Sequence, residues 1–261
     1  MALSYRTLWL SDVHLGTKAS RADDLLTFLS QVRADRIYLV GDIIDLERMK
    51  VKPSFPETHM RVVAKLVNLS NDGTDVIFIP GNHDYEFREL AGSDVLGIPV
   101  MLEAVHRTVT GKKLLVTHGD VLDGRVRSGT NLEKFGAAAH ELILEVDVLI
   151  NRLSRVLGQD YFPLSAYVKR RLRGANEYIR RFEEVAAQYA ADRGFDGIVC
   201  RHIHRPKVRA INGCLYANDG DWVEHRTALA ERPDGTLDVL EWRANSVLVD
   251  ASAVRLPPVA A

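Results

Sequence analysis

The stretch that decides the fold is IYLVGDIID, residues 37–45, in which a short apolar run ends abruptly in acidic residues. Three further runs follow the same design: TLWLSDVH at residues 7–14, VIFIPGNHD at residues 76–84 and LLVTHGD at residues 114–120. Short continuous runs rich in branched residues indicate buried strands. We therefore expect four strands, each followed directly by a polar cluster.

Helical periodicity separates the first three of these runs. Apolar residues recur at helical spacing in residues 22–33 and again in residues 57–69. Alternation of strand and helix implies parallel βαβ units with right-handed crossovers. Because ligands of open α/β sheets bind at the carboxyl ends of the strands, the polar clusters should meet in one place.

The second half of the chain has a different pattern. Residues 132–193 are mainly helical by periodicity, with a helix expected to be capped by Asn176 and to end near Gly194. Strand signals then return at residues 198–200, 207–211, 215–217, 227–231 and 237–242. Asn-Gly and Asp-Gly pairs between them indicate hairpin turns, so this part should be at least partly antiparallel.

Bulk composition excludes several classes of protein. The 261 residues are 46% hydrophobic and 26% charged, which suits one α/β domain, with or without an insertion. The formal net charge of −1 provides no overall field for a nucleic-acid partner, so none is expected. Cys200 and Cys214 stand in apolar runs and are expected to be buried thiols. Without a secretory signal or an apolar run of spanning length, the expected location is the cytoplasm.

The strand ends deliver carboxylate, imidazole and amide side chains, a mixture that suits divalent manganese, iron, zinc or cobalt. Each motif alone also fits a turn residue or a packed core histidine. Together, in order and at strand ends, they favour a metal site with two ions that share a carboxylate, because seven ligands are too many for one catalytic ion. The seven are Asp12, His14, Asp42, Asn82, His118, His202 and His204. The remaining histidines, at 59, 106, 140 and 225, are expected to have surface or packing roles.

The ordered motifs Asp-x-His, Gly-Asp-x-x-Asp, Gly-Asn-His-Asp, His-Gly-Asp and x-His-x-His resemble the calcineurin-like metallophosphoesterase superfamily over about residues 8–204. The resemblance implies an α/β fold, an αββα sandwich of two mixed sheets. It also implies a single domain over residues 1–261, with a mainly helical insertion, or lid, at about residues 122–193.

The same resemblance implies roles for the site residues. One ion would be held by Asp12, His14 and His204, and the other by Asn82, His118 and His202, with Asp42 bridging the two. A metal-bridging hydroxide would attack phosphorus, while His83 assists the leaving oxygen and Asp45 orients His83. Manganese is the expected metal, with iron, zinc or cobalt as alternatives. In one departure, Arg201 stands where the family usually has glycine, and we expect it either to point outward or to change the loop.

Further features resemble the UDP-2,3-diacylglucosamine hydrolase branch, pyrophosphatases of lipid A synthesis. They are the opening LSDVHLG at residues 10–16, the helical insertion, Arg205-Pro206 and YANDGDW at residues 216–222. His83 stands where that branch has arginine, which leaves a different phosphodiester or pyrophosphate open as the substrate. Residues 150–181 carry eight Lys or Arg and two Asp or Glu, which suits an anionic lipid headgroup or a membrane surface, with a solvated basic face as the alternative. The expected substrate contacts there are Ser165, Lys169 and Arg173.

Three functions are therefore weighed. The first is a pyrophosphatase of a nucleotide-linked lipid precursor, in the cytoplasm or at the periphery of the inner membrane face. The second is a soluble phosphodiesterase or protein phosphatase of the same superfamily. The third is a binding scaffold without turnover, which the presence of His83 and of all seven ligand residues disfavours.

Overall fold

The computed structural model describes residues 3–127, 164–203, 205–249 and 254–255. The chain divides into two compact units, residues 1–120 together with 186–261, and residues 121–185. No helix in the described ranges combines the length and the apolar character needed to cross a bilayer.

The first sheet carries three of the four predicted strand ends. Its order is β13-β12-β11-β1-β2-β3, with β14 paired to β12. β1, β2 and β3 are mutually parallel, whereas β11 is antiparallel to β1, so the sheet is mixed. The strands are β1 (Leu3–Leu10), β2 (Val32–Val40), β3 (Asp75–Ile79), β11 (Thr227–Glu231), β12 (Thr236–Arg243), β13 (Ser246–Val249) and β14 (Val254–Arg255).

The second sheet is also mixed. Its order is β6-β7-β8-β10-β9, with β7, β8 and β10 parallel and the two edge strands antiparallel to their neighbours. The strands are β6 (Ala104–Arg107), β7 (Lys113–Thr117), β8 (Gly197–Cys200), β9 (Lys207–Ile211) and β10 (Cys214–Asn218). A small hairpin pairs β4 (Asp94–Val95) with β5 (Ile98–Pro99), and 3-10 turns occupy η1 (Tyr85–Leu90) and η2 (Asp120–Leu122).

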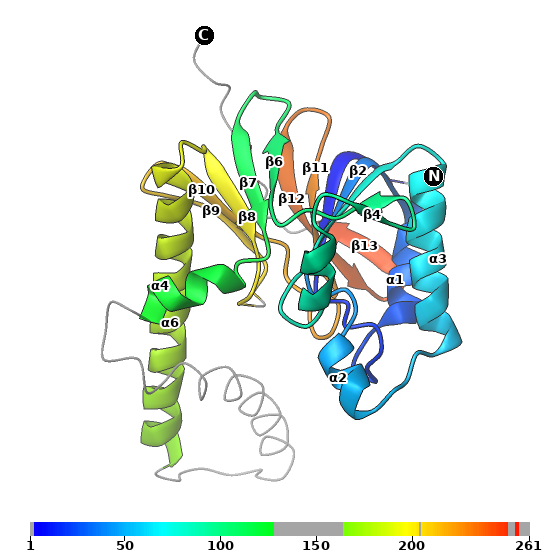
Figure 1. Ribbon diagram of the computed structural model, residues 1–261. Coiled ribbons are helices and arrows are strands. Elements are labelled where there is room, and N and C mark those ends of the chain that lie inside the picture. The colour runs from blue at the N-terminus through cyan, green and yellow to red at the C-terminus, as the bar shows by residue number, and fades with distance from the viewer. Residues whose placement is uncertain (1–2, 128–163, 204, 250–253, 256–261) are drawn as a thin grey trace. The chain divides into compact units, whose positions relative to one another are not determined.

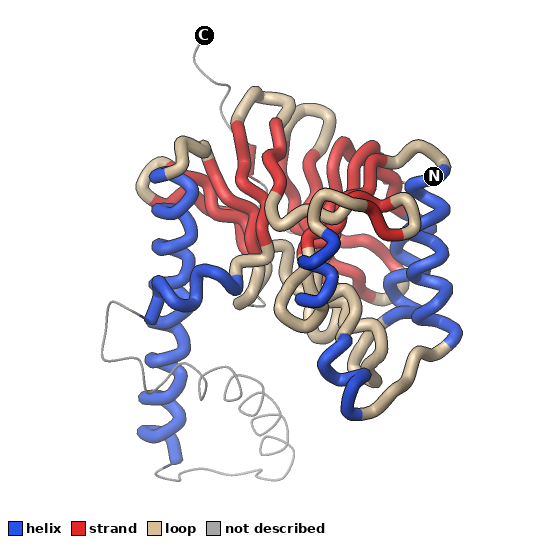
Figure 2. Tube along the Cα trace, viewed as in Figure 1, coloured by secondary structure: helices blue, strands red, loops and turns tan. Residues whose placement is uncertain are grey.

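Two apolar cores hold these layers together. Helices α1 (Ala22–Gln31) and α3 (Glu57–Asn71) pack on the first sheet (Figure 1). From α1, Leu25 and Phe28 are buried in the core. Side chains of both sheets, such as Trp9 from β1 and Val116 from β7, form the second core. The strands of the two sheets stand face to face in the tube view (Figure 2). The prediction of an α/β fold with two mixed sheets is confirmed, and both cysteines are buried as expected.

The second unit contains α4 (Asp123–Arg127) and most of α6 (Leu164–Asp192). Tyr178 donates a hydrogen bond to Asp123 at 2.6 Å, which joins the two helices. α6 runs unbroken through Asn176, so the predicted helix start at that residue is wrong. Strong helix formers flank Asn176 on both sides and outweigh its own preference for a cap. The apolar stripe expected at residues 142–157 lies outside the described residues, and the extent of the insertion stays a prediction.

Candidate metal centre

The loops that follow β1 and β2 lie side by side because the two parallel strands extend their pairing beyond the sheet. The backbone N–H of Asp12 donates to Gly41 O at 3.0 Å, and that of His14 donates to Asp42 O at 3.0 Å. α2 (Leu46–Val51) then begins directly after Asp45, whose side chain caps it by accepting from the N–H of Arg48 at 2.9 Å. These backbone bonds bring the acidic residues of both motifs together.

Several of these residues adopt a backbone conformation that non-glycine residues rarely use. The φ angles of Asp12, His14 and Asp42 are 47°, 48° and 54°, and that of His202 is 88°. Left-handed conformations at such residues carry strain and concentrate at functional sites. Gly81 allows the close approach of the next loop, because a Cβ there would lie 2.2 Å from Asp42 Oδ1.

Two groups of potential ligand atoms result. The ligand atoms of Asp12, Asp42 and His118 all lie within 4.8 Å of one another, and the same holds for His14, Asp45 and His83. All six residues belong to the motifs singled out in the sequence. Carboxylate and imidazole donors at this spacing suit a divalent cation.

Each of the three clustered histidines has a carboxylate at its Nδ1. Asp45 faces both His14, at 3.0 Å, and His83, at 3.2 Å, while Asp120 faces His118 at 3.2 Å. A carboxylate at Nδ1 fixes the ring orientation and directs Nε2 towards a metal or a substrate. Burial alone would raise the pKa of Asp45, but hydrogen bonds from His14 and His83 hold it below its usual range. The hydrogen bond to Asp45 in turn raises the pKa of His83.

His118 provides the test of whether a cation fits. Its Nε2 is buried, has no hydrogen-bond partner among the described residues, and lies 3.5 Å from Asp42 Oδ2. Burial lowers the pKa of His118, but the charges of Asp42 and Asp120 outweigh burial and raise it to about 10. The ring therefore holds a proton that a bound cation would displace. An orphaned buried nitrogen beside a carboxylate is what a metal ligand requires, and these residues fit the ion.

Asp84 and Asp120 were not among the predicted site residues, yet they organise the site. The buried carboxylate of Asp84 accepts hydrogen bonds from the backbone N–H groups of Gly81, Asp42, Ile43 and Ile44, at 2.6 to 3.3 Å. Asp84 thereby joins the loops after β2 and β3. Asp120 bonds both His118 and Arg88. Both residues could have been predicted from the sequence, because Asp84 ends the Gly-Asn-His-Asp motif and Asp120 ends the His-Gly-Asp motif.

The other predicted residues lie as follows. The ring of His202 packs against that of His118, with centroids 5.8 Å apart. Asn82 is half-buried on the loop that follows β3. His204 lies outside the described residues. Ser165, Lys169 and Arg173 lie on α6, in a part of that helix whose side chains are not described. All their roles stay predictions.

Arg201 excludes one of the two alternatives expected for it. Its side chain is fully buried and forms an ion pair with Asp12, so it does not point outward, and a change of the loop stays a prediction. Its Nε donates to Gly220 O at 2.6 Å, and its backbone N–H donates to His118 O at 2.9 Å. The inward orientation follows from the buried carboxylates of the loop after β10, which offer a guanidinium its counter-charges.

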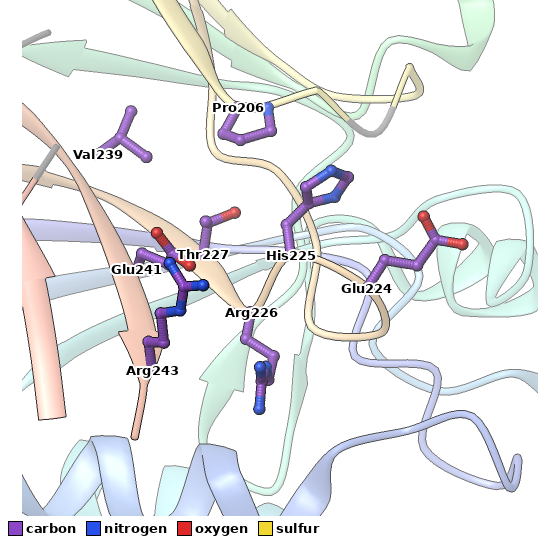
Figure 3. A pocket seen from close by; sticks show the side chains of 8 residues that line it. All are labelled: Pro206, Glu224, His225, Arg226, Thr227, Val239, Glu241 and Arg243. Atoms are coloured by element: carbon purple, nitrogen blue, oxygen red, sulfur yellow. The ribbon is translucent and has the colours of Figure 1, made fainter. Parts of the chain in front are cut away.

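The ligands predicted from the sequence form two halves that share Asp42, and the ligand atoms of Asp12 and His118 lie within 4.8 Å of each other. The Asp12 half consists of Asp12 and His14, with Arg201 against it. The His118 half consists of His118, with Asp120 behind it and His202 beside it. A separate cavity of about 320 Å³ contains none of the predicted ligands and is lined by acidic and basic side chains (Figure 3). The residues that line this cavity are Pro206, Glu224, His225, Arg226, Thr227, Val239, Glu241 and Arg243.

Comparison with known proteins decides the family. The sequence profile of the calcineurin-like phosphoesterases matches residues 5–206, which include all seven predicted metal ligands. The chain belongs to the calcineurin-like phosphoesterase family. As a member of this family it is a metal-dependent phosphoesterase, and its cofactors are divalent metal ions.

Individual relatives of this phosphoesterase extend over nearly its full length. It is 26% identical to the UDP-2,3-diacylglucosamine hydrolase of Stenotrophomonas maltophilia, over 90% of this chain and 98% of the relative. It is 26% identical to the enzyme of the same name from Xanthomonas campestris, over 88% and 96%. Among solved structures, the phosphoesterase YfcE of E. coli is similar with a TM-score of 0.49, at 16% identity, over 94% of this chain and 98% of that chain.

Proposed function

We propose that this phosphoesterase is a pyrophosphatase of a nucleotide-linked lipid precursor, similar to UDP-2,3-diacylglucosamine hydrolase. The observation that carries the proposal is the likeness to hydrolases of that name over 90% of the chain, well beyond the metal motifs. Such coverage includes the basic residues 150–181, the segment that would meet an anionic lipid headgroup.

The proposed ligands follow from the two halves. Asp12 and His14 would hold one ion, His118 with Asn82 and His202 the other, and Asp42 would serve both; His204 remains a predicted ligand of the first. Manganese is the expected metal, with iron, zinc or cobalt as alternatives. When bound, two divalent ions lower the pKa of a water towards neutrality and neutralise phosphate oxygens.

His83 is proposed to protonate the leaving oxygen. Its Nδ1 lies 3.2 Å from Asp45 Oδ1, and its backbone N–H donates to Asp42 Oδ1 at 2.8 Å. The ring is therefore held at one nitrogen and by its backbone, while its side chain keeps 26% exposure through which Nε2 can reach a substrate. The carboxylate of Asp45 raises the pKa of this histidine and so favours the protonated ring that a general acid requires.

The substrate contacts are proposed on α6. Ser165, Lys169 and Arg173 are spaced four residues apart, which places these positions on one face of the helix. Two cations and a hydroxyl on one helix face suit a phosphorylated, lipid-linked substrate, and the same basic face provides for peripheral contact with a membrane surface.

The test is to incubate the purified, manganese-loaded protein with UDP-2,3-diacylglucosamine and to measure UMP. We expect UMP from the wild type and its loss in His83→Ala, with a generic phosphodiester as a parallel substrate. Cleavage of the generic diester without release of UMP would refute the lipid substrate. Faster turnover of cyclic nucleotides or phosphopeptides would favour the soluble phosphodiesterase or protein phosphatase instead.

A further inference from the structure

Arg201 is a buried cation in direct contact with a proposed metal ligand. It is 0% exposed, it forms an ion pair with Asp12 Oδ2, and its Nε donates to Gly220 O at 2.6 Å. The other oxygen of Asp12 faces His14 Nε2 at 3.2 Å. Both carboxylate oxygens of Asp12 are therefore engaged by neighbours within the protein.

The surroundings of Arg201 hold the guanidinium in place. Asp219 and Asp221 are buried on either side of Gly220, and both carboxylates interact favourably with the positive charge of Arg201. Asp219 is in turn fixed by Ser11 Oγ, which donates to its Oδ2 at 2.5 Å. Removal of a buried charge from such partners leaves uncompensated carboxylates, which is costly. These partners consequently hold the guanidinium of Arg201 in its position beside Asp12.

The cation recorded beside the His118 half is Arg88, which pairs with Asp120 and not with a proposed ligand. Nε2 of His118 is buried without a hydrogen-bond partner among the described residues, 3.5 Å from Asp42 Oδ2. A divalent ion there gains an imidazole nitrogen and a carboxylate oxygen as ligands, and it does not have to compete with Arg201 for either of them. An ion in the Asp12 half must instead share Asp12 with a fixed positive charge, and like charges a few ångströms apart repel strongly in a buried site.

We propose that Arg201 competes with a divalent ion for Asp12, so that this protein binds one ion tightly in the His118 half and a second ion only weakly in the Asp12 half. The proposal rests on the metal centre of the proposed function. It predicts that metal concentration controls occupancy of the second site, and that the residue at position 201 determines the stoichiometry.

The experiment measures metal binding directly. Metal-free protein is titrated with Mn²⁺ by calorimetry, and bound manganese is counted by elemental analysis after gel filtration. The wild type should retain one ion, whereas Arg201→Gly should retain two, with affinity for the second ion raised by roughly 10-fold to 100-fold. Arg201→Lys, which keeps the positive charge, is the matched control and should remain close to the wild type.

Electron paramagnetic resonance provides a second readout, because two neighbouring Mn²⁺ ions couple and a single ion does not. The wild type at one equivalent should show an uncoupled ion, which His118→Ala abolishes and His14→Ala retains. Two tightly bound ions in the wild type, with the same affinities as in Arg201→Gly, would overturn the proposal. If Arg201→Gly does not fold, the stoichiometry of the wild type and the two histidine variants still decides it.

The failure of this proposal is distinguishable from that of the proposed function. Two equal, tight sites in the wild type would contradict the competition by Arg201 and leave the dinuclear phosphoesterase intact. Absence of Mn²⁺ binding in every variant, Arg201→Gly included, would contradict both.

Discussion

The two halves of the metal centre are built from the same kinds of side chain but differ in what balances their charge. In the His118 half, a buried imidazole nitrogen faces Asp42 with no other partner among the described residues. In the Asp12 half, a guanidinium from the same protein already pairs with the carboxylate. A cluster of ligand-type residues therefore does not by itself determine how many ions are held. The cations that the chain itself supplies must be counted as well.

The outer shells of the halves also differ. Asp120 supports His118 alone among the clustered histidines and is itself held by Arg88, whose Nη2 lies 2.9 Å from both of its oxygens. Asp45 instead divides its carboxylate between His14 of the Asp12 half and the proposed general acid, His83. A change at Asp120 should consequently affect metal affinity alone. A change at Asp45 should affect both metal binding and proton transfer.

The largest effect is expected at Asp42, the residue that both halves share. Asp42→Asn keeps the shape of the side chain but removes the negative charge that faces His118, so both sites should weaken together. We expect activity to fall below detection and bound manganese to decrease, measured by turnover and elemental analysis. Retention of full metal content and activity would show that the halves do not depend on a common carboxylate.

His83→Ala should separate chemistry from metal binding. Because His83 is proposed to donate a proton and not to bind an ion, kcat should fall by roughly 10²–10⁴-fold. Metal content should stay at the wild-type level in the same preparation. The matched control is Glu47→Gln, whose exposed carboxylate lies 3.8 Å from His83 Nδ1 and should matter little. Loss of metal in His83→Ala would place this histidine among the ligands instead.

Asp120→Asn tests the shell of the His118 half. Its carboxylate holds Nδ1 of His118, and loss of such a partner weakens metal affinity by roughly 10-fold to 100-fold. Calorimetric titration should assign this loss to the tight ion, while the weak site of the Asp12 half changes less. An equal loss at both sites would contradict the independence of the two shells.

The smallest effect is expected outside the metal centre, at the pair between Asp221 and His225. His225 Nδ1 lies 2.5 Å from Asp221 Oδ2. The hydrogen bond to Asp221 raises the pKa of His225, and the charge of Glu224 adds to this while Arg201 opposes it. A histidine pKa raised by folding stabilises the native state fully below the unfolded pKa, and this stabilisation is lost as pH rises through the folded pKa.

His225→Gln should therefore lower stability more at pH 6 than at pH 9. The ring is 41% exposed, so solvent screening limits the effect to about 1 kcal/mol or less. Urea unfolding of both proteins at the two pH values measures it. A loss of stability that does not depend on pH would assign His225 a packing role alone.

Much of the fold could be predicted from the sequence, because strands and helices follow local patterns of apolar residues. Each of the four apolar runs became a strand, and β11 begins and ends at the predicted residues. The motifs at the strand ends predicted that Asp12 and Asp42 meet, because β1 and β2 are parallel neighbours that deliver their carboxyl ends to a common edge. His118 joins them from the end of β7, which belongs to the second sheet, an arrangement that the expectation of one open sheet did not include. The helix start expected at Asn176 failed because an asparagine can lie inside a long helix when its neighbours favour one.

By itself, the sequence determined which residues carry the chemistry, since motif order and strand periodicity are properties of the chain. Only the tertiary structure decided how their charges are balanced. Three features depend on contacts between loops that are distant along the chain. They are the bonds from the backbone of residues 42–44 to Asp84, the sharing of Asp45 by two histidines, and the inward position of Arg201. Burial and counter-charge are set by those contacts, so no local pattern could assign Arg201 to the interior beside Asp12.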